Sequence, residues 1–144
     1  IVGNAADGMR GCLAEEFRNI FVFHLRGNQR TSGEMSRREG GKIFGSGSRA
    51  PIAITILVKN PDQTQNGQIY FHDIGDYLDQ KQKLAIIRKF ASISGITKAN
   101  GWTHIVPNEH FDWIGQRSND FSASSIYRRR MARVLGHSKP ILQA

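Results

Sequence analysis

The residues best suited to chemistry gather in one glycine-rich, basic segment, residues 26–49. Glycine lets backbone approach a ligand closely, and cations suit a ligand rich in phosphate. The cations are Arg26, Arg30, Arg37, Arg38, Lys42 and Arg49, against only Glu34 and Glu39, and the glycines are Gly27, Gly33, Gly40, Gly41, Gly45 and Gly47. The segment indicates either a phosphate-binding loop or a solvated surface loop, and composition does not separate the two.

Other polar groups give weaker signals. The set His104, Glu109, His110 and Asp112 has a spacing that matches no standard zinc or two-metal pattern, so no metal site is predicted. No serine lies in a Gly-x-Ser-x-Gly elbow, and the GSGS of residues 45–48 is not followed by the Gly-Lys-Ser/Thr of a Walker loop. We therefore assign no catalytic residues.

Charge and cysteine content limit the class of protein. The net charge of +8 favours a polyanionic partner such as DNA. Cys12 is the only cysteine, which excludes an internal disulfide and fits a reducing, cytoplasmic location. No run approaches the length of a membrane span, so no membrane association is expected. The sequence begins at Ile1 rather than Met, and we expect a processed piece or a part of a longer polypeptide.

Apolar patterns place the basic segment between two strands. Residues 8–18 carry apolar side chains at helical spacing after Asp7, a suitable N-cap. Residues 19–25 and residues 50–58 are apolar runs rich in β-branched side chains, typical of strands buried on both faces. A helix, a strand, a loop and a further strand form the closing portion of an open α/β sheet.

The second half of the chain predicts a smaller α+β arrangement. After a turn-rich connector, residues 67–74 read as a strand, either a hairpin partner of the preceding one or the first strand of an appended unit. Residues 76–92 predict a helix. Its apolar stripe is Tyr77, Leu78, Leu84, Ile87, Phe90 and Ala91, with Lys81, Lys83, Arg88 and Lys89 outside it on a solvated face.

Three long and unusual strings, RTSGE, SRREGGKIFGSGSRAPIAI and PNEHFDWI, resemble the adenine-N6 methyltransferase region of single-polypeptide, Type ISP restriction–modification enzymes. The resemblance extends from residue 4 to about residue 120. It implies a partial Rossmann-like α/β sheet in residues 1–60, containing the last helix and the last two strands. A connector and the start of a target-recognition-like α+β segment follow in residues 61–121, before a basic tail in residues 122–144.

The resemblance also implies what this chain lacks. The intact family uses S-adenosylmethionine, held by a Phe-x-Gly-x-Gly loop, and orients adenine with an Asn-Pro-Pro-Tyr motif. Neither motif occurs in this sequence, so we expect no cofactor and no methylation by the chain alone. DNA is the expected partner, together with a missing catalytic chain or domain.

Phe44 matches the place where related methyltransferases present an aromatic ring to the flipped base, because stacking recovers part of the cost of extrusion. The alternative is that Phe44 packs beneath the glycine loop as a hydrophobic anchor. The six cations of the loop are the expected phosphate contacts.

The last segment leaves two interpretations open. Residues 122–144 carry Arg128, Arg129, Arg130, Arg133 and Lys139 and no acid. They form either a basic tail, helical around residues 125–135, or the frameshifted end of a gene remnant. The leading hypothesis for the whole chain is a restriction–modification fragment with DNA-facing loops. The alternatives are a stand-alone, non-catalytic nucleic-acid-binding module and a subunit whose sheet is completed by a partner chain.

Overall fold

The computed structural model describes residues 6–45, 48–62 and 65–114. The predictions about residues 122–144 lie outside these ranges. In chain order the elements are α1 (Asp7–Glu16), β1 (Asn19–Arg26), α2 (Gly33–Glu39), β2 (Ile52–Val58), β3 (Gln68–Asp73), α3 (Gln80–Phe90), α4 (Ile93–Lys98) and β4 (Thr103–Ile105). Within these ranges, no helix is long and apolar enough to cross a membrane.

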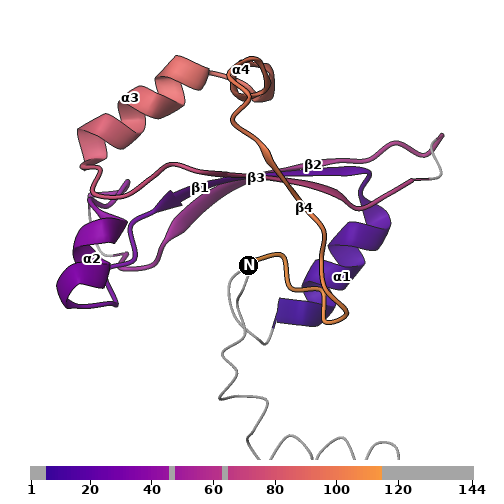
Figure 1. Cartoon of the computed structure of the whole chain (residues 1–144), viewed down its shortest axis with the longest axis horizontal. Coiled ribbons are helices and arrows are strands. Elements are labelled where there is room, and N and C mark those ends of the chain that lie inside the picture. The colour runs from indigo at the N-terminus through magenta and orange to yellow at the C-terminus, as the bar shows by residue number, and fades with distance from the viewer. Residues whose placement is uncertain (1–5, 46–47, 63–64, 115–144) are drawn as a thin grey trace, which may run out of the picture.

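The strands form one open, mixed sheet in the order β2-β1-β3-β4. β1 pairs with β2 in antiparallel and with β3 in parallel orientation, and β4 closes the other edge antiparallel to β3. Helices α3 and α4 lie over one face of the sheet, and α1 and α2 lie over the other (Figure 1). The arrangement agrees with the predicted partial Rossmann-like α/β fold.

Of the two interpretations of residues 67–74, the hairpin with the strand of residues 50–58 does not form. The chain that leaves β2 crosses the start of β1 instead, where the Gly67 and Gln68 amides donate to the Phe17 and Arg18 carbonyls. β3 therefore begins opposite Asn19 and runs alongside β1 in the same direction. Whether the chain divides into domains at residue 60 remains a prediction.

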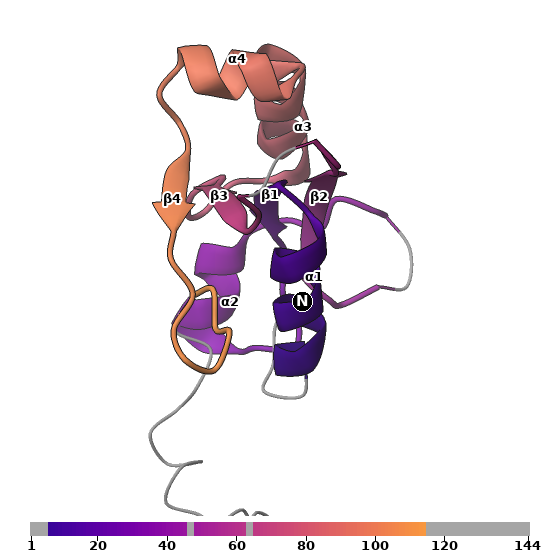
Figure 2. The same ribbon diagram turned by 90° about the vertical axis from the view of Figure 1, so that its right-hand side faces the viewer.

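Side chains alternate across β1 and build a core on each face. The core beneath α3 and α4 contains Phe23, Leu25, Ile74 and Ile96. The core on the α1 side contains Ile20, Ile69 and Trp113, with Leu13 and Phe17 of the α1 region packed against it. Each of the two faces is thus closed by residues from distant parts of the sequence. The turned view shows α3 and α4 on one side of the sheet and α1 and α2 on the other (Figure 2).

A buried ion pair joins α1 to the last described segment. The Arg10 Nη2 atom lies 2.5 Å from Asp112 Oδ1, and Arg10 Nε donates to the Phe111 carbonyl at 2.7 Å. Both charged side chains are removed from solvent. The pair holds Trp113 over the core on the α1 side.

The prediction that residues 50–58 form a strand buried on both faces is wrong. β2 lies at an edge of the sheet, and Ile54 and Ile56 remain 41% and 42% exposed on one face while Leu57 remains 38% exposed on the other. An apolar run is buried on both faces only where a layer covers each face. Among the described residues, β2 has β1 as its sole strand neighbour.

Helices α2 and α3 differ from the sequence expectations in two respects. The segment expected to be a loop contains α2, with Glu34 in its first turn and Arg37 and Arg38 in its last. The helix expected over residues 76–92 is α3, which begins later, after a capping box between Asp79 and Gln82. Phe90 is its last residue, before a left-handed cap.

Candidate nucleic-acid interface

The basic segment emerges where two parallel strands end together. β1 ends at Arg26 and β3 ends at Asp73, and the two strands run in register in the same direction. The carboxyl edge of parallel strands is where open α/β sheets bind their ligands. The segment of residues 27–51, which we call the basic loop, connects this edge to β2 and contains α2.

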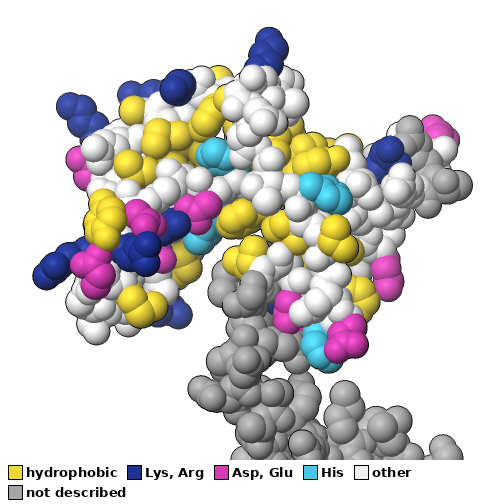
Figure 3. Space-filling model, viewed as in Figure 1, with side chains coloured by type: hydrophobic (Ala, Val, Ile, Leu, Met, Phe, Trp, Pro, Cys, Tyr) yellow, Lys and Arg dark blue, Asp and Glu magenta, His cyan; other side chains and the backbone are white. Residues whose placement is uncertain are grey.

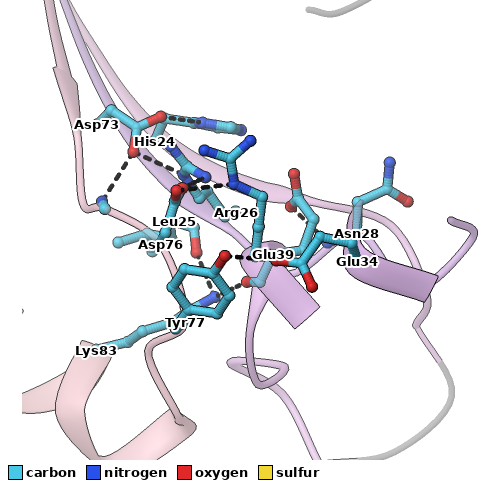
Figure 4. Close-up of polar contacts among 12 residues, drawn as sticks. His24, Leu25, Arg26, Asn28, Glu34, Glu39, Asp73, Asp76, Tyr77 and Lys83 are labelled. Carbon is cyan, nitrogen blue, oxygen red and sulfur yellow. Dashed lines mark hydrogen bonds and ion pairs between the residues drawn. The ribbon is translucent and has the colours of Figure 1, made fainter. Parts of the chain in front are cut away.

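An alternating chain of charges fixes the base of the basic loop (Figure 4). Arg26 Nε donates to Asp73 Oδ1 at 2.7 Å, and the same guanidinium forms an ion pair with Asp76. Asp76 also accepts from Arg38 Nε of α2 at 3.0 Å. His24 Nδ1 lies 3.4 Å from the second oxygen of Asp73. We call Arg26, Arg38, Asp73 and Asp76 the charge network.

Three members of the charge network have pKa values shifted toward their charged forms. Burial opposes the ionisation of Asp73, but hydrogen bonds from Arg26 and the Gly75 amide outweigh it, so the pKa of Asp73 is lowered. Burial likewise opposes the charge of Arg26, yet Asp73 and Asp76 outweigh it and its pKa is raised. The hydrogen bond to Asp76 raises the pKa of Arg38. These interactions favour the charged forms of Asp73, Arg26 and Arg38.

Lys83 of α3 holds the basic loop from the opposite face, and its predicted position on the solvated face is wrong. Its side chain is fully buried, and Nζ donates to the Leu25 carbonyl at 2.8 Å and to the Glu39 carbonyl at 2.7 Å. The end of β1 is thereby joined to the end of α2. Burial lowers the pKa of Lys83, reinforced by the charge of Arg26 and opposed by Glu39.

A sequence signal for this burial existed. Lys83 precedes Ile87 by four residues and Phe90 by seven, so the three side chains share one face of α3. That face packs on the core beneath α3 and α4. A lysine within an apolar stripe is a candidate for a buried amine that needs carbonyl partners.

Two glycines of the basic loop serve close packing of backbone against backbone. The Gly41 amide donates to the Leu78 carbonyl at 2.8 Å. A Cβ on Gly40, whose φ is +69°, would lie 2.1 Å from the Leu78 oxygen, and a Cβ on Gly41 would lie 2.7 Å from the Gln80 nitrogen. The end of α2 thus lies directly against the start of α3.

The predicted phosphate-contacting cations fall into three groups. Arg26 and Arg38 belong to the charge network, with Arg26 only 22% exposed at its side chain. Arg37 lies 3.6 Å from Glu34, and Arg49 donates twice to the Gln29 carbonyl. The side chains of Arg30 and Lys42 make no ion pair within the described ranges, and Arg30 is exposed. The structure brings only Arg26 and Arg38 together, through Asp76.

Phe44 projects from the basic loop with 62% of its surface exposed. This exposure disagrees with the alternative that the ring is an anchor beneath the loop. Phe44 borders a hollow of about 10 Å³ between Arg26, Lys42 and Ile52, which has room for about one water molecule. The hollow is far too small for a nucleoside, so a ring or base could meet Phe44 only from the solvent side.

The four residues considered as metal ligands do not form a cluster that could hold a metal ion. Asp112 pairs with buried Arg10. His104 contacts Gln68 at 3.2 Å, while His110 lies 3.4 Å from Glu109. Nothing in this arrangement supports a metal-dependent site in the part of the chain that the structure describes.

Comparison with solved structures finds proteins that are similar to most of this chain. A nuclease-deletion mutant of the Type ISP restriction–modification enzyme LlaGI, in complex with a DNA substrate mimic, is 51% identical over 82% of this chain, with a TM-score of 0.71. This chain belongs to the Type ISP restriction–modification family. The ATP-dependent Type ISP enzyme LlaBIII, bound to DNA, is 41% identical over 85% of the chain, with a TM-score of 0.75.

The match concerns a small part of these Type ISP enzymes. The chain covers 9% of the LlaGI structure and 8% of the LlaBIII structure. A DrdV–DNA complex is 28% identical over 83% of this chain and has a TM-score of 0.67, while the chain covers 11% of it. No protein-family model matches the chain, and no curated protein sequence does.

Proposed function

We propose that this chain is a segment of the adenine-N6 methyltransferase region of a Type ISP restriction–modification enzyme, and that it contacts duplex DNA through the basic loop. One observation carries the proposal: the chain is 51% identical to part of a Type ISP enzyme captured with a DNA substrate mimic. The position of the basic loop at the carboxyl edge of β1 and β3 supports the same conclusion.

In this proposal one set of cations holds the basic loop in place and another set contacts phosphates. Arg26 and Arg38 hold the loop in place, because Asp73 and Asp76 already neutralise them. The side chains of Arg30 and Lys42 have neither an ion pair nor a hydrogen bond in the described ranges, whereas Arg49 donates to the Gln29 carbonyl, so Arg30 and Lys42 are the groups left to meet phosphates. Such contacts release counterions from DNA, so affinity falls steeply as salt rises.

Phe44 is the proposed stacking residue for an extruded base. Its exposure leaves the ring available on the solvent side of the loop. A ring that stacks on a flipped base recovers part of a cost of a few kcal/mol. The Phe44→Ala variant should therefore bind a mismatched duplex more weakly while binding of a fully paired duplex stays unchanged.

The chain by itself is proposed to hold no S-adenosylmethionine. The hollow at the carboxyl edge beside Arg26 has a volume of about 10 Å³, and the sequence lacks the Phe-x-Gly-x-Gly loop that holds the cofactor in the family. The chain by itself is therefore proposed to be non-catalytic, either as a stand-alone binding module or with the methyltransferase chemistry supplied by a separate region or partner.

The exposed edge of β2 supports a second candidate, a subunit whose sheet is completed by a strand of the catalytic partner. Ile54, Ile56 and Leu57 expose apolar surface on both faces of this edge strand. Such edges pair readily with another strand. Ile56→Lys should then reduce self-association in sedimentation velocity while leaving the thermal midpoint within a few degrees of wild type. An isolated chain that is monomeric at all concentrations speaks against this candidate.

Binding of labelled duplex DNA, followed by fluorescence anisotropy between about 50 and 200 mM salt, tests the main proposal. The wild-type chain should bind with a clear salt dependence. The Arg30→Gln/Lys42→Gln variant should lower the slope of log K against log salt by about 1 to 2, since each lost phosphate contact removes about 0.9. A folded wild-type chain that does not bind duplex DNA contradicts the proposal.

A further inference from the structure

The strongest uncompensated positive charge lies on α3 and α4 rather than on the basic loop. We propose that the outer side of these two helices is a second phosphate-contact surface for duplex DNA, separate from the basic loop. The inference rests on the proposed function, because it assigns a further surface to the same ligand. We call Lys81, Arg88, Lys89 and Lys98 the helical cations.

The charge balance of the two regions is opposite to what the sequence first indicates. Residues 80–108 contain no aspartate or glutamate, and they include all four helical cations as well as buried Lys83. The basic loop, by contrast, loses charge to its neighbours: Asp76 serves both Arg26 and Arg38, and Glu34 faces Arg37. Arginines paired with carboxylates attract phosphate weakly, so the basic loop keeps fewer unpaired cations than α3 and α4 do.

The helical cations are available to a ligand. All four are exposed, and none has an ion-pair or hydrogen-bond partner for its side chain among the residues that the structure describes. Dark-blue side chains project outward over α3 and α4 in the space-filling view, whereas blue and magenta are mixed around α2 (Figure 3). A polyanion can thus approach α3 without displacing an existing acidic partner.

The spacing of the helical cations suits a duplex. Lys81 and Arg88 are seven residues apart, which places them on one face of α3 about 10.5 Å apart along its axis. About three base pairs of DNA span the same rise at 3.4 Å each, so both side chains can reach phosphates of one strand. Lys89 broadens the same face.

Helix stability does not account for this pattern. Arg88 and Lys89 lie in the last turn of α3, where positive charge interacts favourably with the helix dipole. Lys81 lies in the first turn, where positive charge is unfavourable. The acidic N-cap Asp79 accepts from the Gln82 amide, so the helix dipole gives no reason for a cation at Lys81.

Three double variants, each replacing one lysine and one arginine by glutamine, separate the surfaces. Lys81→Gln/Arg88→Gln tests the helical cations, and Arg30→Gln/Lys42→Gln tests the basic loop. Arg18→Gln/Lys59→Gln is the charge-matched control, because Arg18 contacts the Gln65 carbonyl and Lys59 contacts Glu16 near the opposite end of β2. Thermal midpoints verify that each variant is folded.

The measured quantity is the slope of log K against log salt for a labelled duplex. The Lys81→Gln/Arg88→Gln variant should lower the slope by about 1 to 2 relative to the matched control. If the wild-type chain binds DNA but this variant has the same slope as the control, the inference is overturned and the proposed function stands. If the wild-type chain does not bind at all, both fail. Should that variant fold poorly, Lys89→Gln/Lys98→Gln provides the same test.

Discussion

Lys83 Nζ donates a 2.8 Å hydrogen bond to the carbonyl of Leu25, so a helix on one face of the sheet holds the end of its central strand β1. The same amine reaches the Glu39 carbonyl at the end of α2. One side chain therefore fixes the two points between which the basic loop leaves the sheet. A contact of this kind governs the position of the loop without meeting any ligand.

Replacing Lys83 by methionine should lower the free energy of unfolding by about 2 to 3 kcal/mol, because two buried carbonyls lose a charged donor. Urea unfolding measures the change. Lys81→Met is the matched control on the exposed side of the same helix, and it should alter stability by no more than about 0.5 kcal/mol. Equal losses in the two variants would mean that the buried contacts contribute nothing.

The lowered pKa of Asp73 predicts a pH-dependent stability. Because the pKa is lower in the folded than in the unfolded chain, the stabilisation is present above the unfolded pKa, near 3.8, and is lost as the pH falls through the folded pKa. Asp73→Asn should cost about 1 kcal/mol at pH 7, and its difference from wild type should shrink toward pH 2. A difference that is constant with pH would contradict the assignment.

Removing Asp76 should separate stability from DNA affinity. Asp76→Asn releases Arg26 and Arg38 from their shared carboxylate, which should cost about 1 to 2 kcal/mol in urea unfolding. The released guanidiniums should tighten duplex binding at low salt by up to about tenfold and steepen its salt dependence. Weaker binding by a fully folded variant would show that the charge network itself shapes the binding surface.

Gly40 and Gly45 form a pair for testing the basic loop. Gly40 has φ +69° and ψ −160°, and a side chain there would meet the Leu78 oxygen. Gly40→Ala should therefore destabilise the fold by about 3 kcal/mol, from backbone strain and from the clash. Gly45 has open space around it, so Gly45→Ala should change the thermal midpoint little. Similar midpoints for the two variants would contradict the close approach of the Gly40 backbone to Leu78.

The sequence predicts the first elements well because their apolar patterns are local. α1 and β1 follow from the runs around Leu13 and Phe21, and β2 appears where its β-branched residues lie. Burial of β2 was not predictable in this way, since the cover of Ile54 and Ile56 depends on what packs against each face. The parallel pairing of β3 with β1 depends on a long-range crossing that no local pattern indicates.

The basic composition of the candidate site was predictable from the sequence, but the ion pairs that its arginines form were not. The basic character of residues 26–49 is evident, yet the carboxylates that neutralise Arg26 and Arg38 come from the end of β3 and the turn after it. α2 had a local signal, with Ser32 and Glu34 at its start and Gly40 after its end, which the abundance of glycine obscured. The burial of Lys83 also had a local sequence signal, namely its helical spacing from Ile87 and Phe90.

The pair of Arg10 and Asp112 has a consequence for folding during synthesis. The two residues are 102 positions apart, and they hold Trp113 against Ile20 and Ile69. A ribosome must therefore release nearly the entire described unit before the core on the α1 side can close. Until then, nascent α1 and β1 expose that apolar face, so this unit is a candidate for chaperone capture and for slow, high-contact-order folding.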